Sequence, residues 1–325
     1  MTPVLQIENL HVRFATPDGV IEAVRGVDFS VAPGACVGVV GESGSGKSQM
    51  FLAVLGLLAR NGTSTGRVHV EGVELRQDNE DALNRVRGAR IGTIFQDPMT
   101  SLTPHLTIGE QLAEVLQVHR GLARPEARLR SIAMLERVQI GDAHTRMRQY
   151  PHELSGGMRQ RVLVAIALAC DPALVIADEP TTALDVTIQA QILALFRDLL
   201  RDSQLAMVLI THDFGVVADV CDRVAVMYAG RIVEAAPTST IFRIPRHPYT
   251  AGLLAAAPRL DDDEMGPMRT IEGQPASALL EVPGCSFAQR CLQATGRCRG
   301  ERPQLRASGG GGSVACHHPL TAVRA

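Results

Sequence analysis

One eight-residue segment, Gly41-Glu-Ser-Gly-Ser-Gly-Lys-Ser48, constrains this chain more than any other feature. It matches the pattern Gly-x4-Gly-Lys-Ser, in which glycines let backbone N–H groups wrap a phosphate. The apolar run 35–40 before it is typical of a strand buried on both faces, and residues 49–59 after it read as a helix. Strand, glycine-rich turn and helix in this order are the context that the motif requires, so the sequence predicts a phosphate-binding loop.

Within this loop, Lys47 is expected to reach the β- and γ-phosphates and Ser48 to bind Mg2+ through its hydroxyl. Lys47 is the only Lys among 32 basic residues; the other 31 are Arg. A coding bias that replaces Lys by Arg explains the count, and a Lys that survives it marks a position where Arg does not serve. The predicted ATP-binding residues of this segment are Gly41, Glu42, Ser43, Gly44, Ser45, Gly46, Lys47, Ser48 and Gln49.

A companion motif follows further along the chain, where the apolar run 174–177 ends in Asp178 and Glu179. Asp178 is expected to hold Mg2+, through water. Glu179, one residue later, is expected to orient and polarise the attacking water. An acidic pair at a strand end is common by itself, and gains meaning here from the phosphate-binding loop before it.

A third motif, Leu154-Ser155-Gly156-Gly157-Met158, precedes a long apolar stretch. It therefore predicts an exposed helix N-terminus that can bind an anion. One chain already has its own phosphate-binding loop, so this second anion site needs a nucleotide from elsewhere.

Together these motifs resemble the ATP-binding cassette (ABC) family, in which two cassettes pair head to tail and each signature closes on the partner's ATP. The resemblance implies that Gln96 is the glutamine that senses the γ-phosphate and helps to bind Mg2+, and that His212 contacts the γ-phosphate. It also implies that Phe14 stacks on adenine, although a strand Phe is often a core residue. Met158 departs from the Gln of most cassettes. The loop Ala183-Leu184-Asp185 matches the segment that crosses the dimer interface.

The order of elements predicts an α/β fold: a mainly parallel core sheet of the P-loop type, an antiparallel β subdomain and an inserted helical subdomain at about 97–165. Alternating residues 5–14 and 20–31, separated by Pro17-Asp-Gly19, predict the antiparallel strands. Apolar runs at 174–177, 206–210 and 224–227 predict buried strands with helices between them. We expect a nucleotide-binding domain over 1–255 and a small C-terminal region over 256–325, joined near the acidic run 261–264.

Two further segments, Phe95-Gln-Asp-Pro-Met-Thr-Ser-Leu102 and Arg246-His-Pro-Tyr-Thr250, resemble the ATPase subunits of bacterial oligopeptide and dipeptide importers. This implies an ATP hydrolase of the translocase class at the cytoplasmic face of the inner membrane. Its implied partners are a second ATPase subunit, in a heterodimer or a homodimer, two transmembrane permeases and a separate substrate-binding protein. Relatives that import nickel chelates or glutathione-like solutes share these segments.

Composition separates transport from other roles of such cassettes. A net charge of −2 argues against a nucleic-acid partner, and the chain has neither the second cassette nor the long insertions usual in cassette proteins that act on DNA or ribosomes. No apolar run reaches the roughly 18 residues of a membrane helix. The first residues lack the basic and apolar regions of a signal peptide.

The seven cysteines fall into two groups. Cys36, Cys170 and Cys221 lie singly in or beside apolar segments and are expected to be buried hydrophobes. The other four, Cys285, Cys291, Cys298 and Cys316, have the spacing C-x5-C-x6-C-x17-C. They suit a [4Fe–4S] cluster, which the C-terminal regions of peptide-importer ATPases can hold, or Zn2+. His317 and His318 keep a mixed site open, and unligated thiols or disulfides remain the alternative.

Overall fold

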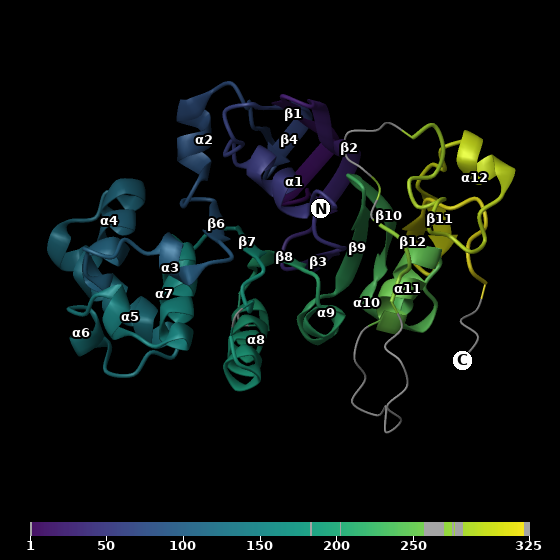
Figure 1. Cartoon of the computed structure of the whole chain (residues 1–325). Helices are drawn as coiled ribbons and strands as arrows, with labels where there is room; N and C mark the ends of the chain where they lie inside the picture. Colours follow the sequence, from purple (N-terminus) through teal and green to yellow (C-terminus); the bar gives the residue numbers. More distant parts are fainter. Residues whose placement is uncertain are drawn as a thin grey trace. The chain divides into compact units, whose positions relative to one another are not determined.

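In the computed structural model of the chain, the described residues are 2–182, 184–201, 203–256, 270–274, 276 and 282–321. The chain divides into two units, each with strands and helices (Figure 1). The first consists of Met1–Leu5, Ser30–Cys36 and His69–Leu209, and the second of Gln6–Phe29, Val37–Val68 and Ile210–Ala325. Ala183 and the acidic run 261–264 lie outside the described residues.

The first unit is built on a parallel strand pair, β6 and β7, with the register Ile91↔Leu174 to Ile94↔Ala177. Both strands are apolar and almost wholly buried, as the continuous run 174–177 predicted. Its elements are β5 (Val73–Glu74), α2 (Glu80–Val86), β6 (Ile91–Ile94), α3 (Pro98–Ser101), α4 (Ile108–Arg120), α5 (Arg124–Arg137), α6 (Ala143–Arg146), the short 3-10 helix η1 (Pro151–Glu153), α7 (Gly156–Leu168), β7 (Leu174–Asp178), α8 (Val186–Arg201) and most of β8 (Ala206–Thr211).

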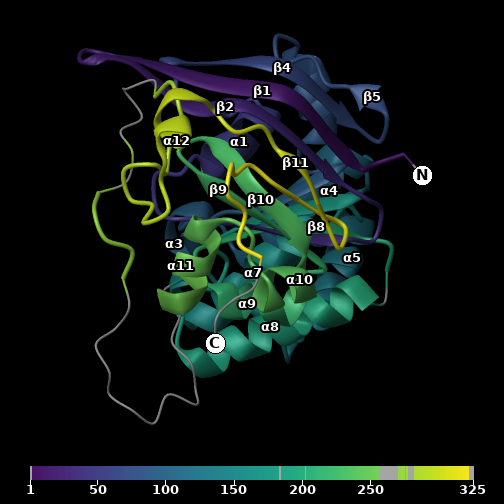
Figure 2. The same cartoon turned by 90° about the vertical axis from the view of Figure 1, so that its right-hand side faces the viewer.

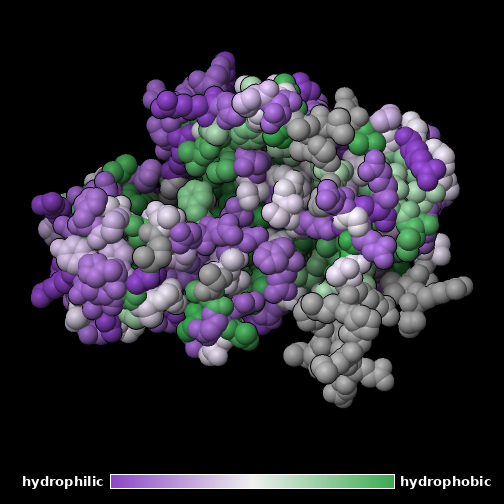
Figure 3. Space-filling view, viewed as in Figure 1, coloured by the Kyte–Doolittle hydropathy of each residue, from purple (hydrophilic) through white to green (hydrophobic). Residues whose placement is uncertain are grey.

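The helices α4, α5 and α6 gather in one group with α3 and α7 (Figure 1). A capping box starts α4: the Thr107 hydroxyl accepts from the N–H of Glu110, whose carboxylate accepts from the N–H of Thr107. Pro125 lies in the first turn of α5, as predicted. Hydrophilic side chains cover most of the visible surface of α4 to α6 (Figure 3), while their apolar faces pack on α7 and on one another.

The second unit is built on another parallel pair, β3 and β9, with Val37↔Arg223 to Val40↔Val226 in register. The antiparallel strands β10 and β12 extend it, and α10 packs on β9, β10 and α9 (Figure 2). Its elements are most of β1 (Leu5–Thr16), most of β2 (Gly19–Val31), most of β3 (Cys36–Val40), α1 (Lys47–Val54), most of β4 (Gly62–Val70), α9 (Phe214–Val220), β9 (Arg223–Tyr228), β10 (Arg231–Pro237), α10 (Thr238–Arg243), α11 (Pro248–Ala256), α12 (Gly296–Gly300), β11 (Arg306–Gly309) and β12 (Gly312–Val314).

Most sequence predictions of elements are confirmed. Strands β1 and β2 are neighbours joined by two residues, a connection possible only for an antiparallel pair. Parallel pairs, antiparallel strands and helices make the fold class α/β. The helix expected over 49–59 is shorter: α1 ends at Val54, because Gly56 adopts a left-handed φ of +63°. In the described part of the chain, no helix is long and apolar enough to cross a membrane.

A glycine of β6 that packs tightly against α7 in the first unit yields a prediction. A methyl group on Gly92 of β6 would lie 2.2 Å from the carbonyl oxygen of Ala167 in α7. Because that oxygen belongs to the backbone, Gly92→Ala must displace strand or helix and should lower the free energy of unfolding by about 1–3 kcal/mol. Urea denaturation measures this.

Gly141→Ala is the matched control, because a methyl group there meets no atom within 4 Å. Equal stability of the two variants would contradict the proposed backbone contact.

Candidate nucleotide site

The predicted phosphate-binding segment of the second unit connects β3 to α1, and two of its three glycines leave no space for a side chain. A Cβ at Gly41 would lie 2.2 Å from the carbonyl oxygen of Met227, and one at Gly46 would lie 2.2 Å from that of Ala23. Gly46 also has a left-handed φ of +100° directly before α1. The loop can follow this path only without side chains at both positions.

Lys47, at the start of α1, points back into this loop. Its ammonium group donates to the carbonyl oxygens of Gly41 at 2.8 Å and Glu42 at 3.0 Å, and the residue is only 6% exposed. The backbone N–H of Glu42 donates to the hydroxyl oxygen of Tyr249 at 2.9 Å. Burial raises the pKa of Tyr249, so this hydroxyl is neutral at physiological pH. The loop therefore surrounds a buried cation with fixed oxygen atoms.

Tyr249 belongs to the segment Arg246–Thr250, and Glu234 of β10 explains how that segment is held. The Glu234 carboxylate is 1% exposed and accepts the backbone N–H groups of Arg246 at 2.7 Å and His247 at 2.8 Å. Burial raises the pKa of Glu234 above its ordinary value, and these hydrogen bonds offset only part of that rise. The sequence singled out this segment as a feature of one branch, but did not predict that Tyr249 contacts Glu42.

In the first unit, the structure brings Gln96 and Glu179 together. The Gln96 amide donates to the Glu179 carboxylate at 3.0 Å, and the Thr182 hydroxyl donates to the same oxygen at 2.9 Å. Both residues follow the carboxyl ends of the parallel neighbours β6 and β7, so they meet at one edge of the sheet. Glu179 has a left-handed φ of +46°, which turns it sharply after Asp178. Sequence reasoning missed Thr182.

The segment 154–158 forms the N-terminus of α7, as predicted. Ser155 is the N-cap, and its hydroxyl accepts from the backbone N–H of Met158 at 3.4 Å. Ser155 and Gly156 are exposed, whereas Gly157 has no room for a side chain: a Cβ there would lie 2.7 Å from Cγ2 of Ile188 in α8. Helix α7 therefore presents free N-terminal N–H groups near its exposed first turn.

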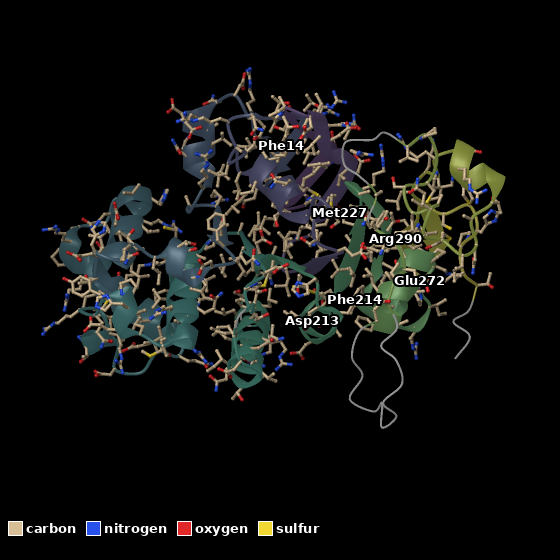
Figure 4. The ribbon with its side chains drawn as sticks, viewed as in Figure 1. Phe14, Asp213, Phe214, Met227, Glu272 and Arg290 are labelled. Carbon is tan, nitrogen blue, oxygen red and sulfur yellow. The ribbon has the colours of Figure 1, made fainter. Side chains whose placement is uncertain are left out.

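The remaining candidates are placed separately. In the first unit, the Asp185 carboxylate caps α8 by accepting from Ile188 at 2.9 Å, and Leu184 is half-buried. In the second unit, His212 is exposed directly after β8. Phe14 (labelled in Figure 4) is half-buried, with its ring against Gly62. This position is compatible both with a core residue and with a ring that stacks on adenine.

The four C-terminal cysteines, Cys285, Cys291, Cys298 and Cys316, line one small cavity of the second unit. Burial, and to a smaller extent the proximity of the other thiols, raises the pKa of Cys285, Cys291 and Cys316, that of Cys316 to about 11. None of the seven cysteines, all of which lie within the described residues, forms a disulfide, and the three predicted to be buried hydrophobes are buried. Among the described residues, no three His, Cys, Asp or Glu side chains are arranged as ligands of a metal ion.

His247 lines the same cavity and is 1% exposed. Its Nδ1 accepts the backbone N–H of Tyr249 at 3.1 Å, so the neutral ring carries its proton on Nε2. Burial lowers the pKa of His247 to about 3, which keeps the ring neutral. Nε2 is buried and has no hydrogen-bond partner among the described residues. An acceptor in the cavity would satisfy it.

Comparison with known proteins assigns the chain to a family. Residues 24–182 match the ABC transporter family, and residues 233–298 match the oligopeptide/dipeptide transporter C-terminal region. The oligopeptide transport ATP-binding protein OppD of Haemophilus influenzae is 52% identical over 92% of each chain, and that of Salmonella typhimurium is 50% identical over 97% of this chain and 94% of its own. The chain belongs to the ATP-binding subunits of ABC transporters. It is therefore an ATP hydrolase coupled to transport.

Solved structures agree with this assignment. The dimeric ATP-binding cassette MJ0796, bound to ADP and Pi, superposes with a TM-score of 0.64 at 28% identity, and the match covers 72% of this chain and 98% of that chain.

A further relative by sequence is the dipeptide transport ATP-binding protein DppD of Bacillus subtilis, which is 48% identical over 90% of this chain and 87% of its own.

The contacts of Lys47 yield a second prediction. Lys47→Arg keeps the charge, but a planar guanidinium is wider than the ammonium that the Gly41 and Glu42 carbonyls surround. We expect it to weaken ATP binding at least about tenfold, which titration calorimetry measures.

Arg76→Lys, the reverse exchange in an exposed ion pair with Asp78, should leave the affinity unchanged. If Lys47→Arg bound and hydrolysed ATP normally, the unique Lys in this Arg-rich chain would be an accident of composition.

Proposed function

We propose that this chain binds and hydrolyses ATP to drive import of dipeptides or oligopeptides across the bacterial inner membrane. The proposal rests on two family matches in one chain. Residues 24–182 match the ABC transporter family, and residues 233–298 match the oligopeptide/dipeptide transporter C-terminal region. The names of relatives about 50% identical over nearly the whole chain support it. Another solute of the same branch, such as a nickel chelate or a glutathione-like compound, is the alternative.

We propose the following roles for the residues of the two nucleotide motifs. The ammonium of Lys47 moves from the loop carbonyls to the β- and γ-phosphates, which the backbone of 41–48 surrounds. Mg2+, held by Ser48, Asp178 and Gln96, would neutralise the charge of the phosphates. Glu179 accepts the proton of the attacking water, while Gln96 and Thr182, which donate to its carboxylate, fix its orientation.

We propose that the exposed N-terminus of α7 binds the ATP of a second cassette, in a heterodimer or a homodimer. The exposed Ser155 and Gly156 support this, as does the dimer in the solved structure of the cassette MJ0796. Two transmembrane permeases and a substrate-binding protein complete the assembly, and the chain attaches peripherally on the cytoplasmic side. We further propose the domains 1–255, with the helical subdomain at about 97–165, and 256–325.

Reconstitution of the chain with its permeases in vesicles tests the substrate. Peptide-loaded binding protein should stimulate ATP hydrolysis and peptide uptake. Stimulation by a nickel chelate or glutathione, with none by peptides, would overturn peptide import and leave ATP-driven transport intact. ATP hydrolysis that no membrane subunit influences would overturn transport itself.

A third prediction concerns Glu179. Glu179→Gln keeps a hydrogen-bond acceptor for Gln96 and Thr182 but cannot accept a proton from water. ATP binding should persist while hydrolysis falls by about 100-fold or more, and the ATP-bound dimer should accumulate. Steady-state hydrolysis and size-exclusion chromatography with ATP measure the two effects.

Thr182→Val is the matched variant, since it removes one donor to Glu179 and keeps the base; its loss of hydrolysis should be smaller. Turnover of Glu179→Gln at the rate of the unaltered protein would exclude Glu179 as the base.

We propose that Cys285, Cys291, Cys298 and Cys316 hold a [4Fe–4S] cluster. Four thiols are the donor set that such a cluster takes, and all four line one cavity, although they are not arranged as metal ligands in the described structure. The buried Nε2–H of His247, which lines the same cavity, would supply a hydrogen-bond donor to a sulfur atom. The histidines beside Cys316 already use a ring nitrogen elsewhere: Nε2 of His317 bonds the Glu301 carbonyl and Nε2 of His318 the Thr295 hydroxyl. These bonds favour a four-cysteine site over a mixed one; Zn2+ remains the alternative occupant.

Anaerobic purification gives the fourth prediction. The protein should be brown and contain about four irons per chain. Cys298→Ser should lose the iron, whereas Cys221→Ser, outside the cavity, should retain it. Zinc in place of iron would identify a zinc site, and a preparation without either metal would overturn the metal proposal.

A further inference from the structure

A partly buried ion pair joins the C-terminal region to the predicted phosphate-binding loop within the second unit. The guanidinium of Arg290 donates through Nη1 to one carboxylate oxygen of Glu42 at 2.7 Å and through Nη2 to the other at 2.9 Å. The Arg290 side chain is 5% exposed and that of Glu42 is 25% exposed. This is the two-pronged arrangement that makes Arg–carboxylate pairs strong and directional.

Arg290 is itself held in place from several sides. Its Nε donates to the carbonyl of Glu272 at 2.9 Å and its Nη2 to that of Ile271 at 3.0 Å (Arg290 and Glu272 are labelled in Figure 4). The guanidinium carbon lies 5.9 Å from the ring centres of both Tyr228 and Phe287. The hydrogen bonds to Glu42 raise the pKa of Arg290, which therefore stays charged.

Glu42 is fixed through its backbone as well. Its N–H donates to Tyr249, and its carbonyl oxygen accepts from Lys47 at 3.0 Å. Arg290 thus binds the side chain of Glu42, and the backbone carbonyl of Glu42 binds the ammonium group of Lys47. The carboxylate of Glu42 also belongs to a loop built to bind an anion, where an unpaired negative charge repels the ligand.

We propose that Arg290 is a positioning residue of the nucleotide site, which neutralises and orients Glu42 so that the loop binds ATP. The inference rests on the proposed ATP-binding role of residues 41–48. It makes ATP affinity dependent on the C-terminal region of the same chain, and it gives that region a function within its own cassette.

The same short segment carries the thiols. The backbone N–H of Arg290 donates to Phe287 at 3.0 Å and that of Ala288 to Cys285 at 3.0 Å, so residues 285–290 form tight turns that end beside Cys291. Cys285 and Cys291 line the thiol cavity, as Phe287 does. A change in the cavity that shifts this segment therefore moves Arg290 and reaches Glu42.

Titration of the purified full chain with ATP tests the proposal, with thermal unfolding of each variant measured in parallel. Arg290→Ala should raise the Kd for ATP about tenfold, since it leaves a partly buried carboxylate unpaired beside the phosphates. Arg290→Lys, which keeps the charge but loses the second prong, should fall between it and the unaltered protein. Arg297→Ala is the control: its pair with Glu301 is also two-pronged but lies at the surface, and the Kd should not change.

A double variant separates charge from packing. Arg290→Ala with Glu42→Gln removes the unpaired charge and should bind ATP more tightly than Arg290→Ala, whereas a purely structural role predicts no recovery. As a single substitution, Cys291→Ser should weaken ATP binding. Added to Arg290→Ala, it should have little further effect on the Kd. Unchanged Kd in Arg290→Ala, or equal losses in the single and double Arg290 variants, would overturn the proposal. Failure of the unaltered protein to bind ATP would instead overturn the proposed function.

Discussion

The predicted phosphate-binding loop has no room for a side chain at Gly41 or at Gly46. Neighbouring strands of the second unit impose this constraint. The carbonyl of Met227 in β9 meets Gly41, and the carbonyl of Ala23 in β2 meets Gly46. Both contacts come from backbone atoms of strands, which cannot move aside as a flexible side chain can. Because β9 is the parallel neighbour of β3, the sheet that delivers the chain to the loop also fixes its path.

Much of this arrangement follows from local sequence patterns, and the rest depends on contacts between distant residues. Continuous apolar runs predict β3, β7 and β9 because strands buried on both faces need no alternation. The parallel pairing of β6 and β7 then explains why Gln96 meets Glu179. No local pattern predicts that Arg290 pairs with Glu42, 248 residues away in the chain, since neither residue has a periodicity or a motif that names its partner.

The C-terminal region gains a core from a source that its own composition does not reveal. Phe287 is the one aromatic residue of the sequence after residue 256. It is 4% exposed and packs on Tyr228 and Tyr249 with ring centres 5.3 and 5.4 Å away, and both tyrosines precede the region in the chain. The thiol cavity lies directly beside this aromatic cluster. The four thiols therefore add to a core that already exists, so they are free to serve another purpose than basic stability.

Tyr249 packs in the aromatic cluster and also accepts a hydrogen bond from the loop. This double contact explains how the loop keeps a conformation that can bind an anion. If Lys47 turns from the loop carbonyls to a phosphate, as proposed, Glu42 loses its contact with the ammonium group. Tyr249 still holds its N–H and Arg290 still holds its carboxylate. Because these two contacts come from the buried core, the backbone keeps its shape while the ammonium moves. Binding then requires little reorganisation of the loop, and the interaction energy is available for the nucleotide.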